Sequence, residues 1–253
     1  MPSATLAYLV LLEARRGPLP WLTLAALALS LCLAVFLSNV ALTESRMLQA
    51  AIVAAVLRAC AVFLVAAHVC ASVLREINDK GLELMLSLPL TRSTQYLGRF
   101  VGFAACGGLI AAAFALPLLA WAPSATVALW AVSLAIEAAL VAAAALFFAM
   151  SLGQLLAAIA ASAGFYLLAR TMTSIQAIAA GPHRDESFAA GVARWVVDGV
   201  ALLFPRLESV TRTDWLLYGL PAPAAYLSAL ASLVLYTVLL IAAGLFDFHR
   251  RGT

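Results

Sequence analysis

The chain has 253 residues, of which 65% are hydrophobic and only 11% are charged. Soluble domains carry about 25% charged residues, so this composition excludes an ordinary soluble fold and indicates a polytopic membrane protein. The apolar runs are about twenty residues long and do not alternate with polar residues, which predicts a bundle of helices rather than a barrel. The formal net charge is only +3, which gives no indication of nucleic-acid binding.

The sequence predicts an all-α membrane protein with one transmembrane domain over residues 1–253. It opens with an amphipathic helix at residues 3–16, which is too short to span a bilayer and is expected at the membrane interface. Residues 173–222 form the largest segment outside the spans, with one or two short helices expected near residues 188–204. Six spans are predicted from the apolar runs, at about residues 21–42, 51–74, 97–121, 127–150, 155–172 and 224–246.

An even number of spans places both chain ends on the same side of the membrane. Arginines and the single lysine gather near both termini and in the loop between the second and third spans, whereas the loop near Arg46 is nearly bare of charge. The positive-inside rule therefore predicts cytoplasmic termini and an extracytoplasmic 173–222 segment. Trp195 and Trp215 in that segment are typical of a membrane–water boundary.

The loop at residues 76–93 carries more pattern than an ordinary connection between spans. Asp79 can cap a short, mostly apolar helix that Pro89 ends, and Thr91 or Ser93 can cap the helix that follows. Two interpretations stay open for the short helix: it rests among lipid headgroups, or it docks against a soluble partner. We favour docking, because the family resemblance described below concerns this same loop.

The sequence lacks the common catalytic and metal-binding patterns. It contains no Gly-x-x-x-x-Gly-Lys-[Ser/Thr], no His-Glu-x-x-His and no Gly-x-Ser-x-Gly, so it offers no nucleotide, zinc-protease or serine-hydrolase motif. The four cysteines all lie in apolar runs and are expected to pack as free thiols. We therefore expect no enzyme activity, no metal site and no cofactor bound by this chain.

Three ionisable residues are predicted inside the spans: Arg58, His68 and Glu137. A charge in hydrocarbon costs at least about 2.5–3.5 kcal/mol, so each is expected to find a partner or a water-filled cavity. Arg58 and Glu137 lie at similar depths, and they either form a buried pair that fixes helix register or line a translocation path. His68 is expected to be a hydrogen-bonded packing residue rather than a proton relay, because no series of acidic residues accompanies it.

The residues from Glu76 to Phe100 contain an extended motif. It reads Lys80-Gly81-Leu82-Glu83-Leu84-Met85-Leu86-Ser87-Leu88-Pro89-Leu90-Thr91-Arg92, followed by Leu97-Gly98-Arg99. This pattern resembles the cytoplasmic loop of type-2 ABC exporter permeases, which usually have Gly-Thr-Leu at positions 80–82 and lysine at position 99. A shorter similarity, in residues 202–208, 213–215 and 218–219, is to the permeases of multicopper-enzyme maturation and nitrous oxide reductase assembly.

The resemblance implies a coupling helix that docks into a separate ABC ATPase subunit, which binds ATP and Mg²⁺. It also implies a permease homodimer or heterodimer in the bacterial cytoplasmic (inner) membrane, surrounded by membrane lipid. Arg92 and Arg99 are either part of the docking surface or anchors for lipid headgroups. The candidate docking contacts are Glu76, Leu82, Glu83, Leu84, Met85, Leu86 and Leu88.

Two functions stay open at this point. The first is export of an unidentified substrate, driven by ATP hydrolysis in the partner subunit. The second is a mechanotransmission module that relays ATPase motion through residues 173–222 to a periplasmic accessory protein without moving a solute.

Overall fold

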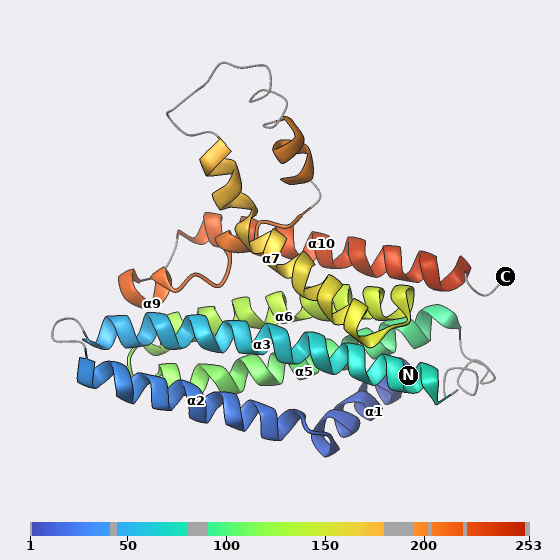
Figure 1. Cartoon of the computed structure of the whole chain (residues 1–253), viewed down its shortest axis with the longest axis horizontal. Helices are drawn as coiled ribbons and strands as arrows, with labels where there is room; N and C mark the ends of the chain where they lie inside the picture. Colours follow the sequence, from blue (N-terminus) through green and yellow to red (C-terminus); the bar gives the residue numbers. More distant parts are fainter. Residues whose placement is uncertain are drawn as a thin grey trace.

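The computed structural model describes residues 2–40, 45–79, 91–179, 195–201, 204–219 and 222–250. All regular secondary structure within these ranges is helical (Figure 1). Residues 195–201 are also helical. The named elements are α1 (Pro2–Arg16), α2 (Leu19–Val40), α3 (Ser45–Asn78), α5 (Arg92–Leu118), α6 (Ser124–Leu152), α7 (Leu155–Ala179), the 3-10 turn η1 (Leu207–Ser209), α9 (Asp214–Tyr218) and α10 (Pro223–Arg250).

Six helices in the described part of the chain are long and apolar enough to cross a membrane: α2, α3, α5, α6, α7 and α10. They confirm the predicted all-α membrane fold and its six spans. Successive long helices run in opposite directions, so α10 ends at the same end of the bundle as α1 begins (Figure 1). The polarity of this arrangement in a membrane stays a prediction.

Two helices have the capping residues that their sequences suggest: α5 at its start and α6 at its end. The side chain of Thr91 caps α5 by accepting a hydrogen bond from the backbone N–H of Thr94 at 3.4 Å, which is the first of the two predicted caps. Gly153 ends α6 with a φ of 66°, a left-handed conformation that glycine adopts without steric cost. The predicted coupling-helix residues Leu82, Glu83, Leu84, Met85, Leu86 and Leu88 lie outside the described residues.

The core of the bundle is formed by α3, α5 and α6, which are the most buried of the six spans. Alanines on α6 let its neighbours approach closely: a Cβ added at Gly107 of α5 would lie 2.9 Å from the Cβ of Ala138. The outer helices α2, α7 and α10 are mostly unburied within the chain. Their exposed apolar side chains include Phe36, Leu156 and Phe246, as expected for surfaces that face lipid or a second subunit.

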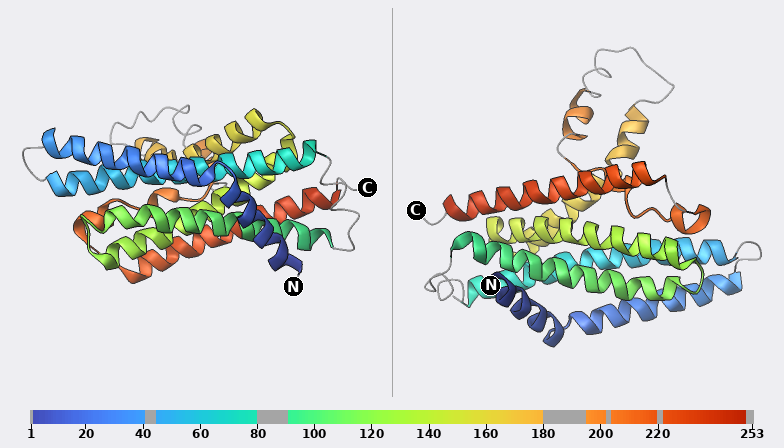
Figure 2. Two further views of the ribbon diagram at one scale, coloured as in Figure 1. Left: turned by 90° about the horizontal axis from the view of Figure 1, so that it is seen from below. Right: turned by 180° about the vertical axis from the view of Figure 1, so that it is seen from behind.

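Helix α1 is held against α5 and runs obliquely to the long helices (Figure 2). Gly102 permits the contact, because a Cβ there would lie 2.7 Å from the Cβ of Val10 and 3.0 Å from the carbonyl oxygen of Ala7. The predicted helix at residues 3–16 is therefore confirmed as a helix. Its position at a membrane interface stays a prediction.

Helix α3 is longer than the membrane requires. It has 34 residues against 22 in α2, and the two are joined through the short connection between Val40 and Ser45. The extra twelve residues of α3 therefore extend past the elbow between α1 and α2 by about 18 Å at 1.5 Å per residue. The N-terminal part of α5 reaches the same end of the bundle (Figure 1), and its Arg99 contacts Glu76 near the end of α3.

Candidate functional site

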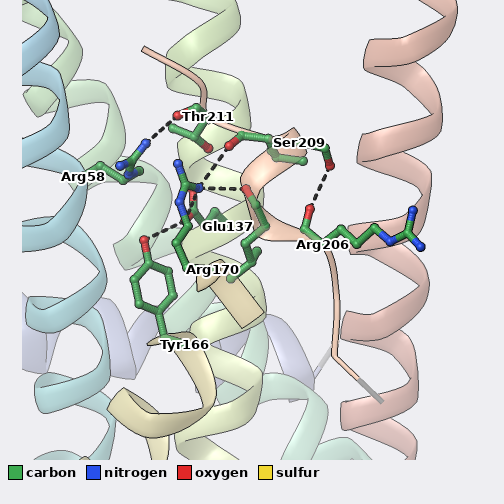
Figure 3. A network of polar contacts seen from close by, with 9 residues as sticks. Arg58, Glu137, Tyr166, Arg170, Arg206, Ser209 and Thr211 are labelled. Atoms are coloured by element: carbon green, nitrogen blue, oxygen red, sulfur yellow. Dashed lines mark hydrogen bonds and ion pairs between the residues drawn. The ribbon is translucent and has the colours of Figure 1, made fainter. Parts of the chain in front are cut away.

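A cluster of charged and polar side chains lies inside the bundle, where α3, α6 and α7 meet the segment before α10 (Figure 3). Arg58 of α3 and Glu137 of α6 are each thirteen residues from the start of their helices, which is about 20 Å of helix. Because α3 and α6 run in the same direction from the same end of the bundle, both side chains lie at a similar height along it (Figure 1). The predicted similarity of their depths is therefore reproduced by the helices.

Glu137 is fully buried, and its partners come from α7. Its Oε1 accepts a hydrogen bond from the Tyr166 hydroxyl at 2.9 Å and forms an ion pair with Nη1 of Arg170 at 3.6 Å. Its Oε2 is buried without a hydrogen-bond partner among the described residues. The partner of Glu137 is thus Arg170, and not Arg58 as one of the sequence alternatives proposed.

The two arginines instead bind the backbone of the segment before α10. Nη1 of Arg170 donates to the carbonyl oxygens of Leu207 at 2.7 Å and Val210 at 3.1 Å. Nη1 of Arg58 donates to the carbonyl oxygen of Thr211 at 2.7 Å. Irregular backbone is tolerated at membrane depth only where protein or water satisfies its polar groups, and here two guanidinium groups provide the donors.

This segment is packed into the bundle rather than lying on its surface. Leu207, Val210 and Thr211 are all fully buried. Thr211 has a φ of 53°, an uncommon left-handed conformation for a β-branched residue, and its Oγ1 has no partner among the described residues. Part of the predicted extracytoplasmic 173–222 segment therefore enters the bundle between α6, α7 and α10.

The two tryptophans of the segment have different surroundings. Trp195 is 79% exposed, which suits the predicted membrane–water boundary. Trp215 in α9 is buried, with its ring centroid 5.4 Å from that of Tyr226. Trp215 is therefore a packing residue of the bundle.

Sequence reasoning found two members of the cluster and missed the others. Arg170 carries the same signal as Arg58, an isolated charge in an apolar run, and it lies two residues before the predicted end of the fifth span. Tyr166 lies one helical turn earlier on the same face. No sequence signal places the carbonyl groups of residues 207–211 beside these side chains, because they come from a segment predicted to lie outside the spans.

His68 lies apart from this cluster, toward the end of α3 that bears the loop. Its ring packs edge-on against Phe103, with centroids 5.9 Å apart. It borders a cavity of about 260 Å³ that is also lined by Glu13 and Ser72. The Nε2 atom is buried without a hydrogen-bond partner among the described residues, so the predicted packing is present while the expected hydrogen bond is not seen at this atom.

A second cluster of polar side chains joins the end of α3 to the start of α5, on either side of residues 80–90. Glu76 of α3 forms an ion pair with Arg99 of α5, with 2.6 Å between Oε1 and Nη2. The Arg99 side chain is only 6% exposed, so it is buried in this pair rather than positioned among lipid headgroups. Glu76, predicted as a docking contact, has its partner within the chain.

Other contacts connect this cluster to the rest of the bundle. Ser72 Oγ of α3 donates to Oε2 of Glu13 in α1 at 2.9 Å. Nη1 of Arg92 at the start of α5 donates to the carbonyl oxygen of His249 in α10 at 3.3 Å. Ser151 Oγ of α6 donates to Oδ2 of Asp247 in α10 at 2.9 Å. The helices that flank the loop are therefore bonded to α1 and α10, and through α10 to α6.

No metal-binding group of three or more His, Cys, Asp or Glu side chains occurs among the described residues. No protein-family model matches the chain, and no curated protein matches it. The fold and its buried polar cluster define a helical multi-pass membrane protein, an architecture compatible with a membrane permease.

Proposed function

We propose that this chain is the membrane-spanning permease subunit of a type-2 ABC exporter, with its 76–93 loop as the coupling element for a separate ATPase subunit. The proposal rests on the sequence resemblance of that loop. The observation that supports it best is the extension of α3 past the start of α2, together with the ion pair between Glu76 near its end and the buried Arg99 of α5. In this proposal, these two helices hold the loop within reach of a soluble partner.

The contacts at the base of the loop suit a subunit that transmits motion. A hydrogen bond between charged groups contributes about 1.5–3 kcal/mol, so α3 and α5 are expected to move together where Glu76 and Arg99 join them. The bonds from Arg92 to His249 and from Ser151 to Asp247 extend this connection to α10 and α6. A force applied at the loop is thereby passed to helices that contact the intramembrane cluster.

In this proposal the chain itself is not an enzyme and binds no cofactor. ATP and Mg²⁺ bind to the ATPase subunit, and the working complex contains two permease chains, as a homodimer or a heterodimer. The largely unburied faces of α2, α7 and α10 are available for the second chain and for lipid. The membrane is the bacterial cytoplasmic (inner) membrane, with the loop on its cytoplasmic side.

The alternative of a mechanotransmission module is favoured by one observation. The segment at residues 204–219 is bonded through Arg58 and Arg170 to α3 and α7, so motion of these helices reaches a region predicted to face a periplasmic accessory protein. Reconstitution in liposomes separates the two functions. ATPase activity that responds to a periplasmic protein alone, without solute movement, favours the relay, whereas solute-dependent ATPase activity with accumulation in the lumen favours export.

The docking role is tested in the loop itself. Glu83→Arg and Met85→Asp are each expected to weaken binding of the proposed ATPase subunit by at least about tenfold, as for central interface residues. Asp79→Asn is the control, because asparagine keeps a capping side chain at the start of the predicted helix and leaves its apolar face unchanged. Copurification with the ATPase and its turnover of ATP are the measurements. If both variants copurify normally and support normal turnover, the coupling role is wrong.

A further inference from the structure

A cavity of about 420 Å³ lies between α1, α2 and α5, on the opposite side of the elbow from His68. Its walls are mostly apolar, and its only charged lining residue is Arg15. The volume falls within the usual range for small-molecule and cofactor sites, which is about 300–1,000 Å³. The residues that line it are Tyr8, Leu11, Leu12, Ala14, Arg15, Leu19, Pro20, Thr23, Cys106, Leu109, Ile110 and Ala113.

Helix α1 has two apolar faces, of which one is buried and the other is only partly covered within the chain. The face with Ala7 and Val10 is buried against α5 at Gly102. The other face carries Tyr8, Leu11, Leu12 and Arg15 at the i, i+3, i+4 and i+7 spacing of one helical stripe. Tyr8 is 59% exposed, and Leu11 and Leu12 are half-buried, so this stripe is partly open to the surroundings of the bundle.

The cavity is long enough to hold most of the part of a lipid tail that lies in one leaflet. From Cys106 to Ala113, its wall on α5 extends for about 10 Å at 1.5 Å per residue. It begins four residues beyond Gly102, the level at which α1 crosses α5. Half of a bilayer core is about 15 Å thick, so a groove that starts beside an interfacial helix and runs this far covers most of one leaflet.

The mouth of the cavity carries uncompensated positive charge. Arg15 is exposed and forms no ion pair with any described residue. Glu13, the nearest acid along α1, is bonded to Ser72 on α3 instead. A guanidinium binds a phosphate through a planar fork of donors, which favours an anionic headgroup at this position.

We propose that this cavity binds one anionic phospholipid per chain, with its phosphate at Arg15 and one acyl chain between α2 and α5. The exposed stripe of α1 covers the glycerol region, and Leu109, Ile110 and Ala113 contact the tail. This site depends on the membrane position of α1 and not on the exporter function. Loss of lipid binding and loss of ATPase coupling are therefore separate outcomes.

The test is native mass spectrometry of the full chain in detergent, titrated with phosphatidylglycerol or with phosphatidylcholine of the same acyl chains. The wild-type chain is expected to retain one phosphatidylglycerol with at least about fivefold preference. Arg15→Gln should lower that retention about fivefold, while Arg16→Gln, the neighbouring arginine that does not line the cavity, should leave it unchanged.

The predicted position of the acyl chain is tested by substitutions that fill the cavity with a larger side chain. Ala113→Phe should displace the lipid, whereas Ala112→Phe, on the exposed neighbouring position outside the lining, should not. Circular dichroism and thermal unfolding show whether each variant is folded, and Thr23→Leu is a second lining change if Ala113→Phe unfolds. Equal retention of the two lipids, equal effects of the two arginine variants, or unchanged binding in a folded cavity-filled variant would each overturn the proposal.

Discussion

Arg170 is the residue whose removal is expected to release the segment at residues 204–211 from the bundle. Its guanidinium donates to two buried carbonyl groups and forms the ion pair with Glu137. Arg170→Met keeps a long, flexible side chain but removes every donor. Glu137 would then keep a single hydrogen bond, from Tyr166.

The expected cost is set by the two hydrogen bonds from the guanidinium that the segment loses. Hydrogen bonds to charged groups contribute about 1.5–3 kcal/mol each, so the loss of two costs at least about 3 kcal/mol. The ion pair with Glu137 joins α7 to α6 and does not itself hold the segment. A cost of about 3 kcal/mol raises the population of the detached segment about a hundredfold, since 1.4 kcal/mol corresponds to a factor of ten.

Hydrogen exchange measured by mass spectrometry in detergent follows this opening without further labels. Peptides from residues 204–219 should exchange about a hundredfold faster in Arg170→Met than in the wild type, while peptides from α10 should be unchanged. Adding Glu137→Gln to Arg170→Met should leave the exchange of this segment nearly unchanged, because the Glu137 ion pair joins α6 to α7 and not to the segment.

Arg206→Met is the matched control in the same segment. Arg206 is exposed. Its contact with Ser209 uses the backbone carbonyl oxygen, which accepts a hydrogen bond from Ser209 Oγ, and not the side chain. This variant should therefore exchange like the wild type. If Arg170→Met also exchanges like the wild type, or if the two arginine variants behave alike, the guanidinium of Arg170 does not hold the segment.

Two further predictions concern α1 and the base of the loop. Gly102→Val should lower the free energy of unfolding in detergent by about 1–3 kcal/mol, because the new Cβ would overlap Val10. Gly108→Ala is the control and should be neutral, because the space around Gly108 is open. Equal melting temperatures of the two variants would contradict the contact between α1 and α5. Glu76→Gln should lower the free energy of unfolding by about 1.5–3 kcal/mol, because it removes the carboxylate that forms an ion pair with the buried Arg99. A double-mutant cycle with Arg99→Gln measures the interaction energy of the pair. If the effects of the two substitutions on the free energy of unfolding are strictly additive, the pair does not stabilise the protein.

The sequence predicts the spans well because bilayer thickness fixes their minimum length and composition. Where helices continue beyond the hydrocarbon, hydropathy no longer marks their ends. The predicted second span stops at residue 74, whereas α3 continues to Asn78 and carries Glu76 beside Arg99. Hydropathy therefore does not predict the ion pair between Glu76 and Arg99.

The intramembrane cluster shows a different limit. An isolated charge in an apolar run identifies Arg58 and Glu137 as residues that need partners, because an unpaired charge is costly there. The identity of those partners depends on where residues 207–211 lie in three dimensions, and neither periodicity nor charge marks that position. The two residues were therefore predicted to lie at one depth, while their separate partners, Thr211 and Arg170, were not.

The buried segment also constrains the order of assembly. Arg58 and Arg170 are synthesised before the carbonyl groups of Leu207, Val210 and Thr211 that accept their hydrogen bonds. During insertion Arg58 therefore enters the bilayer with a penalty of about 2.5–3.5 kcal/mol that its later acceptor has not yet offset, whereas Arg170 can already pair with Glu137. A nascent chain that ends before Leu207 should remain a loosely associated set of helices, sensitive to membrane quality control, until the final fifth of the polypeptide docks.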